Sequence, residues 1–109
     1  MKLGEIAEKL ELERLTPLFD REVTGVYISD KLSDVIANAK GGDLLVTGQI
    51  NANALAAAGL VELSAILIAQ GKPPDPELIR KAEKAELSIL ATALSRAQVA
   101  AKLYEAGIR

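Results

Sequence analysis

The chain has 109 residues, half of them apolar, and 13 basic against 15 acidic side chains give a net charge of −2. It contains no histidine and no cysteine, which excludes imidazole bases, thiolate nucleophiles, disulfides and ordinary zinc sites. Balanced charge and few aromatic residues argue against a nucleic-acid partner. The longest apolar run, residues 65–69, is far shorter than the roughly 20 residues that cross a bilayer. We therefore expect a cytoplasmic protein with no membrane partner and a single domain over residues 1–109.

The first predicted element is an amphipathic helix in "KLGEIAEKLELERL", residues 2–15. Apolar side chains recur at helical spacing from Leu3 to Leu10, and Glu and Lys occupy the opposite face. Thr16-Pro17 predicts the end of this helix, because the residue before a proline is disfavoured in the helical conformation.

A repeated pattern follows, in which a short aliphatic run leads through a small polar turn into an amphipathic helix closed by glycine or a charged residue. This pattern is typical of βαβ units. The predicted strands are residues 23–29, 43–47, 64–69 and 88–91. Helices are expected after each of them.

Capping residues predict where these helices begin and end. Asp30 is the expected N-cap of the first, and Gly41-Gly42 is expected to end it with a left-handed residue. Its buried face is expected to contain Leu32, Val35, Ile36 and Ala39. Asp75 followed by Pro76 predicts a later helix start, and Ser95 with Gln98 forms a capping box before the last helix.

These elements predict an α/β fold: a small, mostly parallel four-stranded sheet with helices on both faces, preceded by an N-terminal helix. Crossovers of this length join parallel strands and are nearly always right-handed. The competing interpretation is an all-helical chain. The β-branched residues and the glycine of "VTGVYIS" (23–29) argue against it.

Ligands of open parallel sheets bind beyond the carboxyl ends of the strands. Four segments are expected there: residues 29–30, 47–49, 69–71 and Thr92. The uncharged donors and acceptors of "TGQINANA" (47–54) make this the most suggestive stretch. The candidate ligand-binding residues are Ser29, Asp30, Thr47, Gly48, Gln49, Asn51, Asn53 and Thr92. The alternative is that these are ordinary turn and cap residues, with Asn51 or Asn53 capping the next helix.

Neither a catalytic residue nor a cofactor is predicted. The chain has no phosphate loop and no dinucleotide fingerprint, because the required glycine spacings are absent. Asp30 and Asp34 lie one helical turn apart and could hold Mg²⁺ weakly, but their place near a helix start explains them equally well. Asp20 and Arg21 are interpreted as a solvated ion pair.

Three stretches together resemble the DRTGG domain: "DREVTGVYISDKLSDVIANAKGGDLLVT", "AILIAQGKPPDPELIRKAE" and "ILATALSRAQVAAKLYEAGI". The resemblance covers residues 2–108. The name motif is interrupted, since Glu22 and Val23 separate Asp20-Arg21 from Thr24-Gly25. "DREVTGVYISD" (20–30) is thus mainly the first strand with the expected N-cap of the helix that follows. It also contains the interrupted name motif, Asp20-Arg21 and Thr24-Gly25, which is called the family label below.

The resemblance implies that this chain has relatives in three settings. Related modules are fused to some phosphate acetyltransferases and form the amino-terminal part of the HPr serine kinase/phosphatase. Some stand-alone versions are similar to proteins encoded beside iron-only hydrogenase subunits.

Our leading hypothesis is a non-catalytic regulatory module that binds a small anionic or nucleotide-like ligand at the carboxyl end of the sheet. The alternative is an assembly protein that docks on a partner enzyme such as a hydrogenase complex. A third hypothesis is an enzyme that uses carboxylates and a metal. Self-association, as a homodimer, is expected because a short open sheet leaves edges to cover.

Overall fold

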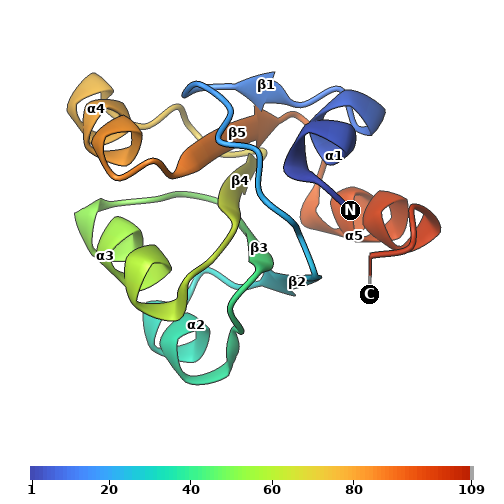
Figure 1. The fold of residues 1–109 in the computed structure, drawn as a ribbon, viewed down its shortest axis with the longest axis horizontal. Helices are drawn as coiled ribbons and strands as arrows, with labels where there is room; N and C mark the ends of the chain where they lie inside the picture. Colours follow the sequence, from blue (N-terminus) through green and yellow to red (C-terminus); the bar gives the residue numbers. More distant parts are fainter. Residues whose placement is uncertain (109) are drawn as a thin grey trace.

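The computed structural model describes residues 1–108, which form five helices and five strands in the described part of the chain. The helices are α1 (Leu3–Lys9), α2 (Leu32–Asn38), α3 (Ala52–Val61), α4 (Pro76–Lys84) and α5 (Arg96–Glu105). The strands are β1 (Glu13–Arg14), β2 (Gly25–Ile28), β3 (Asp43–Thr47), β4 (Ala65–Ala69) and β5 (Ser88–Thr92). Figure 1 shows their arrangement.

The strands form one mixed sheet in the order β1-β5-β4-β3-β2. Strands β2 to β5 are parallel, as predicted, and neighbours in the sequence are neighbours in the sheet. Strand β1 was not predicted: Glu13 and Arg14 pair antiparallel with β5. The sheet therefore has five strands where four were predicted. Glu13 and Arg14 are exposed charged residues between two leucines, and this pattern fits the continuation of a helix as well as a strand.

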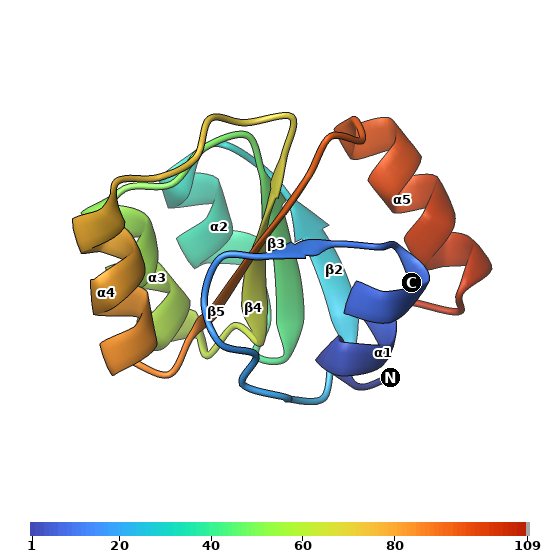
Figure 2. The same ribbon diagram turned by 90° about the horizontal axis from the view of Figure 1, so that it is seen from above.

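The helices cover both faces of the sheet. Helices α2, α3 and α4 lie on one face, and α1 and α5 lie on the other (Figures 1 and 2). The sequential strand order explains this placement, since successive right-handed crossovers in one direction put their helices on the same side. The last helix crosses to the opposite face and packs beside α1.

The core follows the two-residue alternation of the buried strands. Leu44 and Val46 of β3 point toward α1 and α5, whereas Leu45 packs with the residues under α2 and α3. All five residues of β3 and of β4 are buried, as expected for parallel strands covered on both faces. Ile36 was predicted to be buried but is 46% exposed, because α2 lies over the edge strand and turns this side chain outward.

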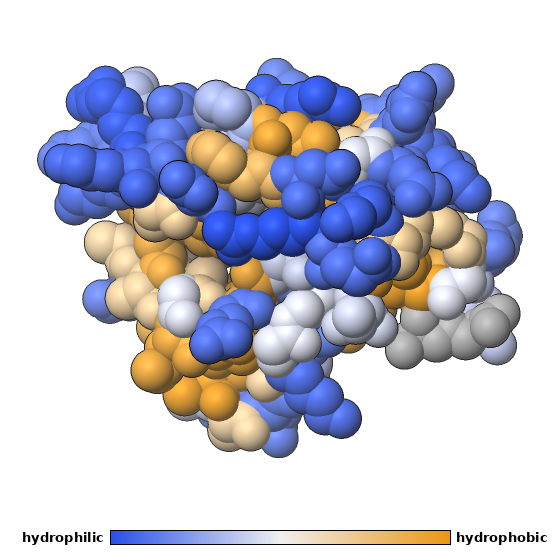
Figure 3. All heavy atoms as spheres, in the orientation of Figure 1, coloured by the Kyte–Doolittle hydropathy of each residue, from blue (hydrophilic) through white to orange (hydrophobic). Residues whose placement is uncertain are grey.

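Apolar side chains also gather on the surface over α2 and α3 (Figure 3). Leu60 of α3 is 73% exposed, and Ile28 of β2 is exposed as well. Among residues 1–108, no helix is both long enough and apolar enough to cross a membrane.

Three of the five helices share one C-terminal motif, Ala-x-x-x-Glu-Leu. In each, the glutamate has a positive φ, and the amide of the leucine donates to the carbonyl of the alanine: Leu12 to Ala7, Leu63 to Ala58, and Leu87 to Ala82. This is the Schellman arrangement, in which glycine is the usual left-handed residue. The last helix uses glycine there, with Gly107 at φ +96° and the Ile108 amide bonded to the Leu103 carbonyl.

The other predicted caps have mixed outcomes. Asn51 caps α3, and Ser95 with Gln98 forms the predicted capping box of α5. Asp75 and Pro76 begin α4, although the Asp75 side chain makes no capping hydrogen bond. The prediction for Asp30 was wrong, since Lys31 is the N-cap position of α2. Gly41-Gly42 does not end α2 directly: α2 ends at Asn38, and Gly42 adopts its positive φ in the turn before β3.

Candidate functional site

The Asp20-Arg21 part of the family label lies at the amino ends of the strands and joins helices together. The Asp20 carboxylate accepts the Gly4 amide of α1 at 2.9 Å. The Arg21 guanidinium donates to the Glu86 carbonyl at 2.5 Å and to the Leu63 carbonyl at 3.5 Å, at the ends of α4 and α3. The two side chains are not the local ion pair that we predicted. They stabilise the junction between the N-terminal segment and both helix ends.

The Thr24-Gly25 part of the label forms the contact between β2 and the turn before β3. The Thr24 amide donates to the Gly42 carbonyl at 3.0 Å. A Cβ at position 25 would lie 2.6 Å from the Asp43 carboxylate, and that buried carboxylate accepts the Lys40 amide at 2.8 Å. A larger residue at position 25 would have to displace this carboxylate, so glycine preserves the contact, and the label as a whole has a structural role.

The opposite end of the sheet, where β2 to β5 terminate, is called the carboxyl edge below. Here Asp30, just after β2, accepts the Thr47 hydroxyl and the Gly48 amide, each at 2.7 Å. It also pairs with the Arg96 guanidinium at the start of α5. One carboxylate therefore holds together the ends of β2 and β3 and the first turn of the last helix.

These bonds favour the ionised form of Asp30. The Arg96 guanidinium, then the Gly48 amide and the Thr47 hydroxyl, hold the pKa of the Asp30 carboxyl well below its usual range. The same carboxylate raises the pKa of Arg96. Asp30 is therefore an acceptor held in the charged state and is a poor candidate for a general acid.

Two backbones approach each other closely at the carboxyl edge. A Cβ on Gly71, in the loop after β4, would overlap the carbonyl group of Gly48. A Cβ on Gly48 would lie 2.5 Å from the Arg96 guanidinium. Gln70, which precedes Gly71, has a left-handed backbone with φ 55°, and its amide donates to the Thr92 carbonyl at 2.9 Å. Strain of this kind gathers at functional sites.

The eight predicted residues do not form one cluster. Asp30, Thr47 and Gly48 come together in the network above, and the Gln49 carbonyl accepts from the Thr47 hydroxyl at 3.2 Å. The Ser29 hydroxyl accepts the Lys31 amide at the start of α2. Asn51 caps α3 through the Ala54 amide, and Asn53 is exposed in the first turn of that helix. Thr92 lies apart from these, at the end of β5.

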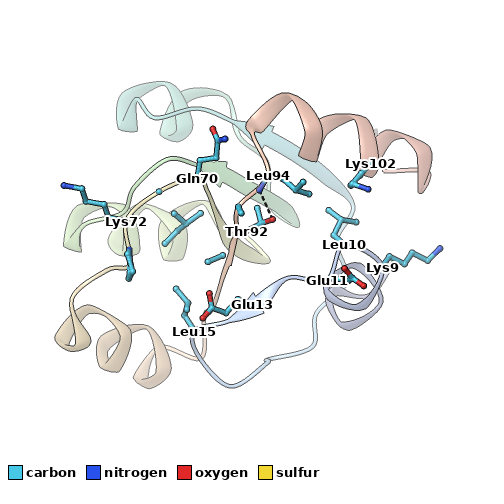
Figure 4. Close-up of a pocket in the computed structure, with 15 residues that line it drawn as sticks. Lys9, Leu10, Glu11, Glu13, Leu15, Gln70, Lys72, Thr92, Leu94 and Lys102 are labelled. Carbon is cyan, nitrogen blue, oxygen red and sulfur yellow. Dashed lines mark hydrogen bonds between the residues drawn. The ribbon is translucent and has the colours of Figure 1, made fainter.

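Thr92 lines the main cavity, a hollow of about 960 Å³ bounded by the ends of β4 and β5, the β1 segment, α1 and α5. Its apolar lining consists chiefly of Leu10, Leu15, Ile68, Ala91 and Leu94. Its charged lining consists of Lys9, Lys72, Lys102, Glu11 and Glu13. In Figure 4, Lys72 lies at one end, Lys9 and Lys102 at the other, and Thr92 and Leu94 between them.

A second hollow of about 390 Å³ lies across the loop 70–75, between the starts of α3 and α4. Of the predicted residues in "TGQINANA", Gln49 and Asn51 line this groove. Lys72 and Pro73 line both hollows. The carboxyl edge therefore has two concave regions separated by one proline-containing loop.

Asp34, the carboxylate of α2, takes part in other contacts. Asp34 accepts the Tyr27 hydroxyl at 2.7 Å and the Asn38 carboxamide at 2.8 Å. The hydrogen bond from Tyr27 lowers the pKa of Asp34 and raises that of the tyrosine. Asp30 and Asp34 thus belong to separate networks, and residues 1–108 contain no cluster of three or more acidic side chains that could hold a metal.

The DRTGG domain model matches residues 6–106. The chain belongs to the DRTGG domain family. No curated protein matches the sequence. This DRTGG chain is also similar to a solved structure, the CBS and DRTGG domains of the regulatory region of Clostridium perfringens pyrophosphatase, complexed with the activator diadenosine tetraphosphate. The TM-score is 0.70 at 16% identity, and the match covers 93% of this chain and 45% of that one. The likeness confirms the DRTGG fold.

Residue patterns alone did not single out Arg96, Gln70 or Lys102. The position of Arg96 could have indicated its role. A cation in the first turn of a helix interacts unfavourably with the helix dipole, which indicates that an acidic partner lies elsewhere in the fold. Gln70 lies in a predicted edge segment, but residue types do not indicate its left-handed backbone or the close approach of the neighbouring Gly71 to Gly48. Lys102 had no signal, because a lysine in the last turn of a helix is ordinary.

Proposed function

We propose that this DRTGG chain is a non-catalytic regulatory module, acting as one domain, which senses a small anionic or nucleotide-like ligand at the carboxyl edge of its sheet. One observation carries the proposal: that edge is hollow and its rim holds three lysines, Lys9, Lys72 and Lys102. The two ion pairs of residues 1–108 involve none of them. Glu11 and Glu13 line the same cavity, so its lysines exceed its carboxylates by one. A concave site with an excess of positive charge suits an anion.

The solved relative supports a regulatory role. Its structure comprises the regulatory region of an enzyme, with a nucleotide activator bound. That region contains CBS domains in addition to the DRTGG domain, and this chain spans less than half of its length. The proposal for this chain therefore depends on its own carboxyl edge, and the relative supplies the class of role.

The predicted site residues fall into three groups in this proposal. Thr92, with Gln70 and the lysines, contacts the ligand in the main cavity. Asp30, Thr47 and Gly48 hold the edge together through Arg96. Gln49 and Asn51 line the second groove, whereas Ser29 bonds the start of α2 and Asn53 is exposed in the first turn of α3. The chain contains neither histidine nor cysteine, and Asp30 is held ionised, which supports binding without catalysis.

Thermal unfolding against a ligand panel tests the proposal. The panel contains adenine and guanine nucleotides, phosphorylated metabolites and inorganic phosphate. A ligand at one hundred times its Kd adds about 2.7 kcal/mol of stability, which raises the Tm of a domain of this size by roughly 10 °C or more. No shift with any member contradicts the proposal and favours the docking alternative, for which capture of a partner enzyme is the next experiment.

A further inference from the structure

The main cavity presents three kinds of chemistry. Its floor is apolar, built by Ile68 and Ala91 at the ends of β4 and β5 and by Leu94 after β5. Two carboxylates, Glu11 and Glu13, lie on the α1 and β1 side, with Lys102 on α5. Within residues 1–108, neither these carboxylates nor the lysines of the cavity form an ion pair. Their bonding capacity is therefore open to a ligand.

Gln70 and Thr92 add hydrogen-bonding groups beside the apolar floor. The described residues give the Gln70 carboxamide no hydrogen-bond partner, so both its donor and its acceptor face solvent at the cavity rim. The Thr92 hydroxyl accepts the Leu94 amide at 3.2 Å, which leaves its own proton to donate. The other non-glycine residues with positive φ, Glu11, Glu62 and Glu86, follow helix ends, whereas Gln70 follows a strand.

We propose that the main cavity binds a purine nucleoside diphosphate, with the base on the apolar floor and its polar edge toward Gln70 and Thr92. The ribose hydroxyls face Glu13, which lies near Leu15 and apart from the end that holds Lys9 and Glu11 (Figure 4), since carboxylates are common partners of a ribose diol. The diphosphate lies at the end of the cavity that holds Lys102 and Lys9. This inference rests on the proposed function and narrows it to one ligand class and one of the two hollows.

Other anionic ligands match the lining less well. A phosphorylated sugar has many hydroxyl groups and would leave the apolar floor without a partner. A fatty acid would place its chain among charges of both signs. A nucleotide offers an apolar base to the floor, a diol to a carboxylate and a diphosphate to the lysines, and a volume of about 960 Å³ is within the range of small-molecule sites, roughly 300–1,000 Å³.

Titration calorimetry of the full chain with ADP, adenosine and pyrophosphate tests the ligand class, with GDP measured in parallel. We expect ADP or GDP to bind at least about tenfold more tightly than either fragment, a difference of about 1.4 kcal/mol. Equal affinity for pyrophosphate and the nucleotides would overturn the inference and leave the proposed anion sensor in place. Binding of none of the four, together with no response to the wider panel, would contradict both.

Two variants test the position of the ligand. Glycine suits a left-handed backbone, so Gln70→Gly removes the carboxamide without disturbing the fold. We expect it to weaken ADP binding by about tenfold, the upper range of a neutral hydrogen bond, and to leave pyrophosphate binding unchanged. Lys102→Gln should weaken ADP and pyrophosphate by a similar factor and spare adenosine. Lys84→Gln, an exposed charge change at the end of α4, is the matched control.

Two results with these variants would contradict the placement of the ligand. Wild-type ADP affinity in both Gln70→Gly and Lys102→Gln overturns the placement in the main cavity. Loss of ADP binding in Lys84→Gln as well would also overturn it, because the effect would then follow net charge alone.

Discussion

At the scale of single residues, the Asp30 carboxylate is the central contact of the carboxyl edge. We expect Asp30→Asn to lower the free energy of unfolding by about 1 kcal/mol at neutral pH. The side chains of Asp30 and Arg96 are 48% and 42% exposed, so solvent screens the pair and keeps the effect small. Asp75→Asn, whose carboxylate makes no capping bond, is the matched control and should change stability little.

The same pair predicts a pH dependence. The pKa of Asp30 is lowered in the folded chain, so its stabilisation is fully present above the unfolded value of about 3.9. It is lost as the pH falls from there toward the folded pKa. Urea unfolding at about pH 7 and about pH 3 should therefore show the difference between wild type and Asp30→Asn shrinking in acid. A difference that stays constant across this range contradicts the charged role of Asp30.

Two glycines provide a second residue-scale prediction. Gly71→Ala should destabilise the fold by about 2 kcal/mol, because its Cβ would overlap the Gly48 backbone, which cannot move aside as a flexible side chain can. Gly59→Ala, within α3, meets nothing within 4 Å and should stabilise by about 1 kcal/mol through helix propensity. Thermal unfolding of both variants checks the opposite signs. Equal effects would show that the 48–71 contact is not tight.

The site was only partly predictable from residue types. The segments at the carboxyl edge followed from where the strands end, and Asn51 was correctly weighed as a cap. The joining of Asp30 to Arg96 depends on α5 crossing to the other face of the sheet, which local patterns do not encode. The main cavity depends on a second long-range event, the pairing of β1 with β5.

At the scale of elements, the Ala-x-x-x-Glu-Leu helix ends predict a stabilising substitution. Glu86 has φ 55° in the Schellman end of α4, and a left-handed backbone costs a non-glycine residue roughly 1–2 kcal/mol. Glu86→Gly should therefore stabilise by about 0.5–1 kcal/mol after the added entropy of the unfolded chain is subtracted. The bond from Arg21 is kept, since it goes to the backbone carbonyl of residue 86.

Glu83→Gly is the matched control for that variant. It replaces the same residue type within α4 and should destabilise by about 1 kcal/mol. Urea unfolding distinguishes the two cases. A destabilised Glu86→Gly would mean that the glutamate side chain itself supports the helix end.

Most elements were predictable because their signals are local. The four parallel strands and the capping box of α5 arise from periodicity and short motifs within each segment. The helix predicted over residues 2–15 was wrong beyond Lys9, because Glu11 turns left-handed and Leu12 closes the Schellman bond. A glutamate gives no local warning of that conformation, whereas a glycine there would have predicted the end.

At the scale of the whole molecule, the outer edge of β2 is open, since within residues 1–108 this strand pairs with β3 alone. Ile28 and Ile36 lie exposed on β2 and α2. We expect a homodimer through this surface at tens of micromolar, detected as a doubled mass in light scattering. Ile36→Lys should yield monomers, and Ala101→Lys, exposed on α5 on the opposite face, should remain dimeric. A monomeric wild type contradicts this expectation.

The walls of the main cavity come from opposite ends of the chain, α1 and β1 on one side and β5 and α5 on the other. During synthesis the cavity can therefore form only after α5 has been made and packed beside α1. Closure over so long a separation is slow compared with local pairing. Binding of the proposed ligand is expected to join α1 to α5, so that hydrogen exchange in these two helices slows together while that of α3 stays unchanged. Under the proposed function, ligand binding in the main cavity would therefore require α1 and α5 to be packed together.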